Sequence, residues 1–128
     1  MPIQRLSTRH VTVLKNPGKR SKQLVWPRNA PEASMTITRV TIEPGAVSRR
    51  HAHAKSEQIW IVERGFGVLL MADDKESELK AGDIVRTPPG ETHGVRNTGS
   101  EPLVYLAITS PPEDFTSAYE NEEAEERT

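Results

Sequence analysis

Short apolar runs, each closed by turn residues, fill the chain between residues 34 and 110 and constrain its fold most strongly. The run SMTITRVTI alternates in polarity and is rich in β-branched residues, and QIWIV, VLLMA, IVRT, HGVRN and PLVYLAITS follow it. Between the runs lie turn sequences such as EPGA, ERGFG, DDKES, AGD and PPGE. Val, Ile, Thr and Tyr favour strands, whereas Gly, Pro, Asp and Asn favour turns. Because no run has a helical period, the pattern predicts an all-β, antiparallel sandwich or barrel.

The two ends of the chain differ from this central part in charge. We expect a barrel over residues 34–112, preceded by an N-terminal arm over 1–33 and followed by an acidic tail over 113–128. The arm holds seven Lys or Arg before its first acid, and its runs HVTVL and QLVW are candidate edge strands on either side of a loop. The tail begins with PPEDFTSAYE, a candidate helical turn, and we expect its strongly acidic end to be partly disordered.

Composition excludes several classes of function. The chain has no cysteine, which rules out disulfides, thiolate metal sites and cysteine nucleophiles. The net charge of -1 provides no global attraction for nucleic acid or a membrane surface. No apolar run is long enough to span a bilayer, and the first residues lack the apolar core of a signal peptide. We therefore expect a cytoplasmic protein that binds neither nucleic acid nor membranes, although the basic arm leaves nucleic-acid binding open.

The stretch HAHAKSEQIWIV contains two histidines, His51 and His53, separated by one residue. On a strand, side chains two residues apart share a face, so both imidazoles would point the same way. Neutral imidazoles are good ligands for divalent first-row metals. The pair alone does not distinguish a metal site from two surface histidines among basic residues.

Two spaced motifs place this pair in a wider pattern. The first reads G-x5-H-x-H and ends in a later glycine, at Gly45, His51, His53 and Gly65. The second reads G-x5-P-x-G-x2-H-x3-N, at Gly82, Pro88, Gly90, His93 and Asn97. Chance agreement is implausible because two motifs occur in order on a β-rich chain. Over residues 40–110 the sequence resembles the cupin superfamily, in particular its small single-domain bacterial members, which often carry mannose-6-phosphate isomerase-like labels.

The resemblance implies a fold and a ligand set. The fold is the cupin double-stranded β-helix, an antiparallel jelly-roll barrel. The metal ligands are His51, His53 and His93, and the metal is a divalent first-row transition ion such as Fe, Mn, Ni or Zn. Cupins of this size usually form homodimers, for which HVTVL and the outward side chains of Ile59 and Ile61 are a candidate apolar surface.

The family motif has a glutamate three or four residues after the second histidine, where this chain has Glu57 and Gln58. The six-residue spacer counted back from Gly65 reaches Gln58. If Gln58 faces inward, so does Trp60. Both faces of this strand are apolar, however, so its periodicity does not decide whether Gln58 or Glu57 faces inward. We therefore predict Gln58 as the fourth metal ligand, with Glu57 as the alternative.

A glutamine ligand changes the expected chemistry. Its amide carries no charge, so the centre keeps the full charge of the metal, binds it less tightly and attracts anions more strongly. An amide cannot act as a general base, which makes Glu57 a candidate catalytic group. Arg86 is a second candidate, as a clamp for a substrate carboxylate or phosphate. The alternative for both residues is a charge on the barrel surface, with Glu57 paired to Lys55 or an arginine.

Two functions of different classes fit these residues. The resemblance implies a metal-dependent enzyme that acts on a small organic acid, carbonyl compound or sugar, of the dioxygenase, isomerase or lyase type. The alternative is a non-catalytic module that binds a sugar or small acid, with the metal as a docking point. The fold hosts many chemistries, so the motifs alone do not select one reaction.

Overall fold

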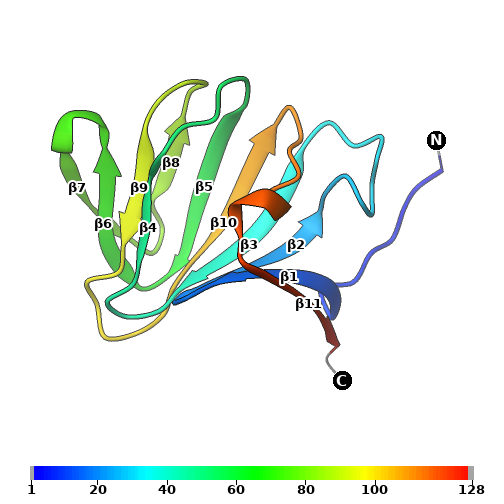
Figure 1. The fold of residues 1–128 in the computed structure, drawn as a ribbon, viewed down its shortest axis with the longest axis horizontal. Helices are drawn as coiled ribbons and strands as arrows, with labels where there is room; N and C mark the ends of the chain where they lie inside the picture. The colour runs from blue at the N-terminus through cyan, green and yellow to red at the C-terminus, as the bar shows by residue number, and fades with distance from the viewer. Residues whose placement is uncertain (1, 127–128) are drawn as a thin grey trace.

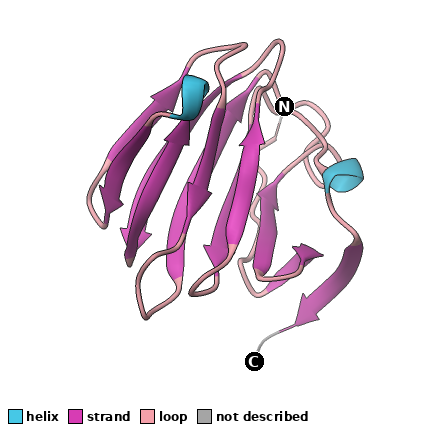
Figure 2. Ribbon diagram, turned by 60° about the vertical axis from the view of Figure 1, so that its left-hand side comes forward, coloured by secondary structure: helices cyan, strands magenta, loops and turns pink. Residues whose placement is uncertain are grey.

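The computed structural model describes residues 2–126, which form two antiparallel β-sheets (Figures 1 and 2). One sheet has seven strands in the order β11-β1-β2-β3-β10-β5-β8, and the other has four in the order β4-β9-β6-β7. Within the described residues, the helical elements are two 3-10 turns, η1 (Ala72–Asp74) and η2 (Thr116–Ala118). The expected all-β, antiparallel architecture is confirmed. No helix of the described part is long and apolar enough to cross a membrane.

Every apolar run identified in the central sequence forms a strand. The larger sheet contains β1 (His10–Asn16), β2 (Lys19–Val25), β3 (Thr36–Ile42), β5 (Glu57–Arg64), β8 (Ile84–Thr87), β10 (Leu103–Ser110) and β11 (Asn121–Glu126). The smaller sheet contains β4 (Val47–His51), β6 (Phe66–Met71), β7 (Glu76–Lys80) and β9 (His93–Arg96). Two strands of the smaller sheet, β4 and β7, were not expected. Each buries a single residue, Ser48 and Leu79 respectively, so neither shows hydrophobic alternation.

The inward faces of three neighbouring strands, β3, β10 and β5, change from apolar to polar along their length. Pairing places Val40 beside Tyr105 and Val62 beside the same tyrosine, within the apolar core. Further along, Thr109 pairs with both Thr36 and Gln58, and all three of these polar residues are buried. The barrel therefore has an apolar core at one end and a buried polar region at the other.

The N-terminal arm and the acidic tail lie against each other. β11 runs antiparallel to β1, and in Figure 1 it continues the chain from η2 to the outer edge of the larger sheet. Opposite charges join the two ends, since Lys15 Nζ lies 2.6 Å from a Glu123 carboxylate oxygen and Arg28 Nη1 lies 2.7 Å from Glu122. Within the described residues the tail contains η2 and then the edge strand β11, which ends at Glu126, and residues 127–128 lie outside the described part. Partial disorder of the tail stays a prediction.

This pairing changes two further expectations about the arm. The segment between β1 and β2, expected as a loop, is a tight hairpin in which Asn16 pairs with Lys19. β1 has neighbours on both sides and buries Val13 and Leu14 completely. These side chains of HVTVL therefore cannot form the apolar dimer surface that the sequence suggested.

Candidate metal centre

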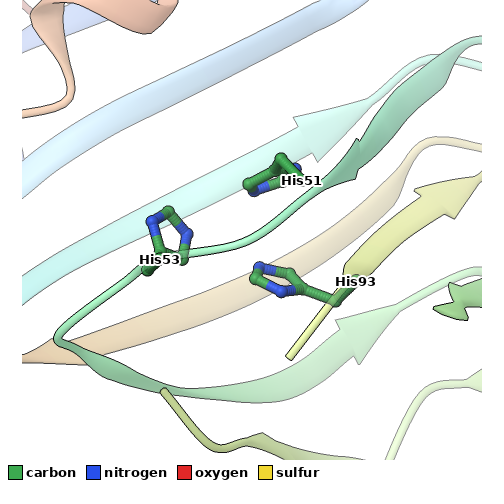
Figure 3. Close-up of side chains that lie close together, drawn as sticks. All are labelled: His51, His53 and His93. Carbon is green, nitrogen blue, oxygen red and sulfur yellow. The ribbon is translucent and has the colours of Figure 1, made fainter. Parts of the chain in front are cut away.

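Three histidines converge at the polar end of the barrel (Figure 3). His51 ends β4, His53 lies in the loop that follows, and His93 begins β9. The ring centroids of His51 and His93 are 4.4 Å apart, and His53 lies 5.1 Å from each. Their candidate ligand nitrogens all lie within 4.8 Å of one another, a spacing that a single metal ion can bridge.

Backbone contacts bring the two histidine-bearing segments together. β4 and β9 pair antiparallel with His51 opposite His93. Gly94 allows this close approach, because a Cβ there would lie 2.7 Å from the carbonyl oxygen of Ser48. Gly90 has a φ of +82°, which suits glycine, and its N–H donates a 2.8 Å hydrogen bond to the carbonyl of His53. Gly90, a motif residue, and Gly94, next to His93, thus allow the segments that carry the histidines to lie close together.

The two nitrogens of each imidazole have different surroundings: Nδ1 lies next to an oxygen of the protein, and Nε2 is the candidate metal ligand. His51 Nδ1 bonds to the Arg49 carbonyl at 2.7 Å and His93 Nδ1 to the Glu91 carbonyl at 3.3 Å, while His53 Nδ1 lies 3.4 Å from a Glu113 carboxylate oxygen that has no hydrogen-bond partner. The Nε2 atoms of His53 and His93 are buried and have no hydrogen-bond partner. An Nδ1–H bound to an oxygen leaves a basic Nε2, which is how ligating histidines are usually oriented. The three residues therefore fit a divalent metal.

The cluster is also in the right protonation state. Burial lowers the pKa of His51 and of His53, and burial together with the charge of His51 lowers the pKa of His93 to about 4. All three pKa values lie below the usual 6.5, so the imidazoles are neutral at pH 7. Neutral imidazole is the form that binds metals.

Gln58 lies on the cavity side of β5. Its side chain is buried, and its amide Nε2 donates to Thr109 Oγ1 at 2.8 Å. Its Oε1 accepts a 2.7 Å hydrogen bond from the indole N–H of Trp60, and an amide oxygen has a second lone pair for another partner. Gln58 lines the same cavity as His51 and His53. Its assignment as the fourth ligand stays a prediction.

The two catalytic candidates lie elsewhere. Glu57 faces away from the large cavity, and its carboxylate accepts a 3.0 Å hydrogen bond from Arg86 on β8. The strand pairing explains this contact between Glu57 and Arg86. Arg86 lies opposite Ile59, and side chains two residues apart on β5, such as Glu57 and Ile59, lie on the same face of the sheet. Arg86 lines a second cavity of about 340 Å³, which His93 also borders. Their catalytic roles stay predictions, and the geometry instead makes them an ion pair.

Two residues beside His53 were not identified from the sequence. The Glu113 carboxylate contacts His53 Nδ1, and the ring centroid of Phe115 lies 5.5 Å from that of His53. The backbone of Glu113 is fixed by Thr36, whose hydroxyl donates to its carbonyl at 2.8 Å and accepts from its N–H at 2.9 Å. These residues belong to the segment after β10, outside both motifs, so no spacing pattern pointed to them.

A cavity of about 720 Å³ adjoins the histidines. Trp60 and Tyr105 form part of its wall, with ring centroids 4.4 Å apart in a stacked arrangement, and Phe115 and Tyr119 come from the C-terminal segment. Lys19, from the start of β2, contributes a positive charge. The volume is typical of sites for small organic molecules.

Known proteins are similar to this chain in sequence or in fold. The chain is 34% identical over 72 residues to the oxalate-binding protein of Thermotoga maritima, covering 56% of this chain and 59% of that protein. It is 29% identical over 111 residues to gentisate 1,2-dioxygenase of a Ralstonia species, covering 87% of this chain and 29% of the enzyme. A solved structure of a sugar phosphate isomerase of the cupin superfamily, from Silicibacter pomeroyi, matches with a TM-score of 0.64 and 27% identity. That match covers 73% of this chain and 60% of the isomerase.

The chain spans less than two thirds of the length of each of these three proteins. A family model described as "Cupin domain" matches residues 38–109, more than half of the chain. This range begins within β3 and ends within β10, so it contains all three histidines and Gln58.

Proposed function

The chain belongs to the cupin domain family, and we propose that it is a metal-dependent enzyme acting on a small organic acid, carbonyl compound or sugar. The observation that carries this proposal is the three-histidine cluster, in which two buried Nε2 atoms have no protein partner. Leaving such polar atoms buried without a partner is costly unless a ligand occupies the site.

The residues that would hold the metal are His51, His53 and His93, with Gln58 as the fourth ligand. A divalent Fe, Mn, Ni or Zn ion held there would polarise a carbonyl or carboxylate oxygen of the bound compound. The stacked rings of Trp60 and Tyr105 would orient the compound and keep water from that side of it.

Two reaction types have support from relatives whose names state an activity, a dioxygenase and a sugar phosphate isomerase. Dioxygen uptake separates them. We would load the purified protein with Fe(II) and supply 1,3-diketones, catechols, flavonols and thiols in turn. Uptake with one class, lost in His93→Ala, supports the dioxygenase type. Aldose–ketose interconversion without oxygen uptake supports the isomerase type.

A non-catalytic binding module is the second candidate, and the similarity to an oxalate-binding protein favours it. In that case the protein binds a small acid but turns over no member of the substrate panel. His51→Ala separates two forms of this function. Unchanged acid affinity in that variant indicates binding without the metal, and lost affinity indicates that the metal is the docking point.

A further inference from the structure

We propose that Lys19 forms an anion-binding subsite in the large cavity, and that the compound bound at the metal centre is therefore a small organic carboxylate rather than a neutral sugar. This inference rests on the proposed function, since the metal centre supplies the second contact. Lys19 lies outside the residues that match the family, so its role comes from its position in this fold.

The position of Lys19 is fixed by two neighbours. Its Nζ donates a 2.8 Å hydrogen bond to the hydroxyl of Ser48, three residues before His51 on β4. The ring centroid of Tyr119 lies 5.1 Å from the same Nζ, a cation–π contact. An ammonium group has three N–H donors, and Ser48 accepts one of them. Donors therefore remain for a ligand in the cavity that Lys19 lines.

The charge of Lys19 is not balanced by an acid. Lys15 and Arg28 of the basic arm pair with acids of the C-terminal segment, whereas no ion pair among the described residues joins Lys19 to a carboxylate. Burial lowers the pKa of Lys19 to about 8, which still leaves the amine mostly protonated at pH 7. A partly buried cation without an anionic partner is stabilised by an anionic ligand.

The remaining charges around the cavity also favour an anion. Lys19 lines the same cavity as His51 and His53, and the Glu113 carboxylate beside His53 is the opposing charge near the cluster. Arg49 and Arg50 line the cavity too, although Arg50 donates to the carbonyl of Met71 at 2.8 Å. The acid among the lining residues, Glu120, is exposed. If Gln58 is the fourth ligand, its neutral amide does not offset the positive charge of the metal, and that charge would also attract an anion.

The donors favour a carboxylate over a phosphate. Phosphate sites usually combine several donors, such as a bidentate Arg or consecutive backbone N–H groups. Lys19 instead offers one compact charge beside the aromatic wall of Trp60 and Tyr105. This arrangement suits a compound with a carboxylate at one end and a flat or apolar body.

Calorimetric titration of two acid–amide pairs tests the subsite: malonate with malonamide, and benzoate with benzamide, alongside inorganic phosphate. The wild-type protein is titrated metal-free and after zinc loading, with zinc content measured on each sample. We expect each acid to bind at least tenfold more tightly than its amide. In Lys19→Met that preference should disappear, and in Lys19→Arg most of it should remain. The matched control is Lys15→Met, which removes a lysine paired with Glu123 outside the cavity.

Several results would overturn the inference. These are equal affinity for acids and amides, acid affinity unchanged in Lys19→Met, no saturable binding of either acid, or phosphate binding more tightly than both acids. Thermal unfolding of each variant shows whether a loss of binding is due to a loss of folding. If Lys19→Met does not fold, Lys19→Arg replaces it as the test. A folded Lys19→Arg that has lost the preference for acids over amides then overturns the inference. The protein could also take up no zinc and still prefer acids over amides in a way that depends on Lys19. That result contradicts the proposed metal function and supports the anion-binding subsite.

Discussion

Gln58 is held by hydrogen bonds on both sides of its amide, from Trp60 and to Thr109, so its side chain cannot rotate freely. Replacement by glutamate keeps an acceptor for the indole N–H and adds a negative charge beside the histidines. We expect Gln58→Glu to bind zinc about tenfold more tightly or better, measured by competition with a chromogenic chelator. Glu57→Gln is the control and should leave zinc affinity unchanged. Equal affinity in Gln58→Glu and the wild type would argue against Gln58 as a ligand.

Glu113 is expected to orient His53 through the contact of its carboxylate with Nδ1. Loss of such a partner typically weakens metal binding by about 10- to 100-fold. We expect Glu113→Ala to reduce zinc affinity within that range and Glu113→Gln to reduce it less, because the amide keeps an oxygen acceptor beside His53 Nδ1. Glu63→Ala, which removes an acid paired with Arg39 outside the cavity, should have no effect. Unchanged affinity in Glu113→Ala would show that the contact has no positioning role.

Motif spacing identified candidate site residues that lie close together in the sequence, and the structure shows why spacing could find them. His51, His53 and Gln58 follow one another along β4, a loop and β5, so one short interval of sequence contains all three. Glu113 and Lys19 reach the same site from the two ends of the chain. Only tertiary packing brings them there, so neither could be found from spacing.

At the scale of elements, the segment from η2 to β11 closes one side of the cavity. Arg28 joins it to the N-terminal arm by donating to Glu122 at 2.7 Å and to the Thr116 hydroxyl at 3.0 Å. The sequence showed a basic arm and an acidic tail as separate charged ends. Their pairing was not predicted because a strand whose stabilisation comes from opposite charges has no hydrophobic alternation to mark it.

Removal of the Arg28 contacts should loosen this segment. Exposed ion pairs contribute modestly, so we expect Arg28→Ala to speed amide exchange in residues 116–122 by about fivefold. Hydrogen–deuterium exchange with mass spectrometry measures this directly. Arg39→Ala, which breaks a comparable pair with Glu63 on β5, should leave these amides unchanged. Equal exchange in both variants would mean that the segment is held by β11 pairing alone.

Over the molecule as a whole, the outer face of the larger sheet exposes apolar side chains. Ile61 and Ile84 lie opposite each other on β5 and β8 and are 37% and 71% exposed. We propose that this patch, without the HVTVL contribution expected from the sequence, is the contact of a homodimer. Light scattering after size exclusion should give a dimer for the wild type and a monomer for the double variant Ile61→Glu, Ile84→Glu. Ile3→Glu, at a 95% exposed residue of the arm, is the control. A monomeric wild type at micromolar concentration would contradict the proposal.

The proposed function depends on the three-histidine metal centre, and metal content tests that centre most directly. Protein purified without chelator, and the same protein stripped and reloaded, would be analysed by inductively coupled plasma mass spectrometry. We expect about one equivalent of a first-row metal in the wild type and in His10→Ala, whose histidine lies outside the cluster. His51→Ala, His53→Ala and His93→Ala should each retain much less. Less than about one tenth of an equivalent in the reloaded wild type would contradict a metal centre at these histidines.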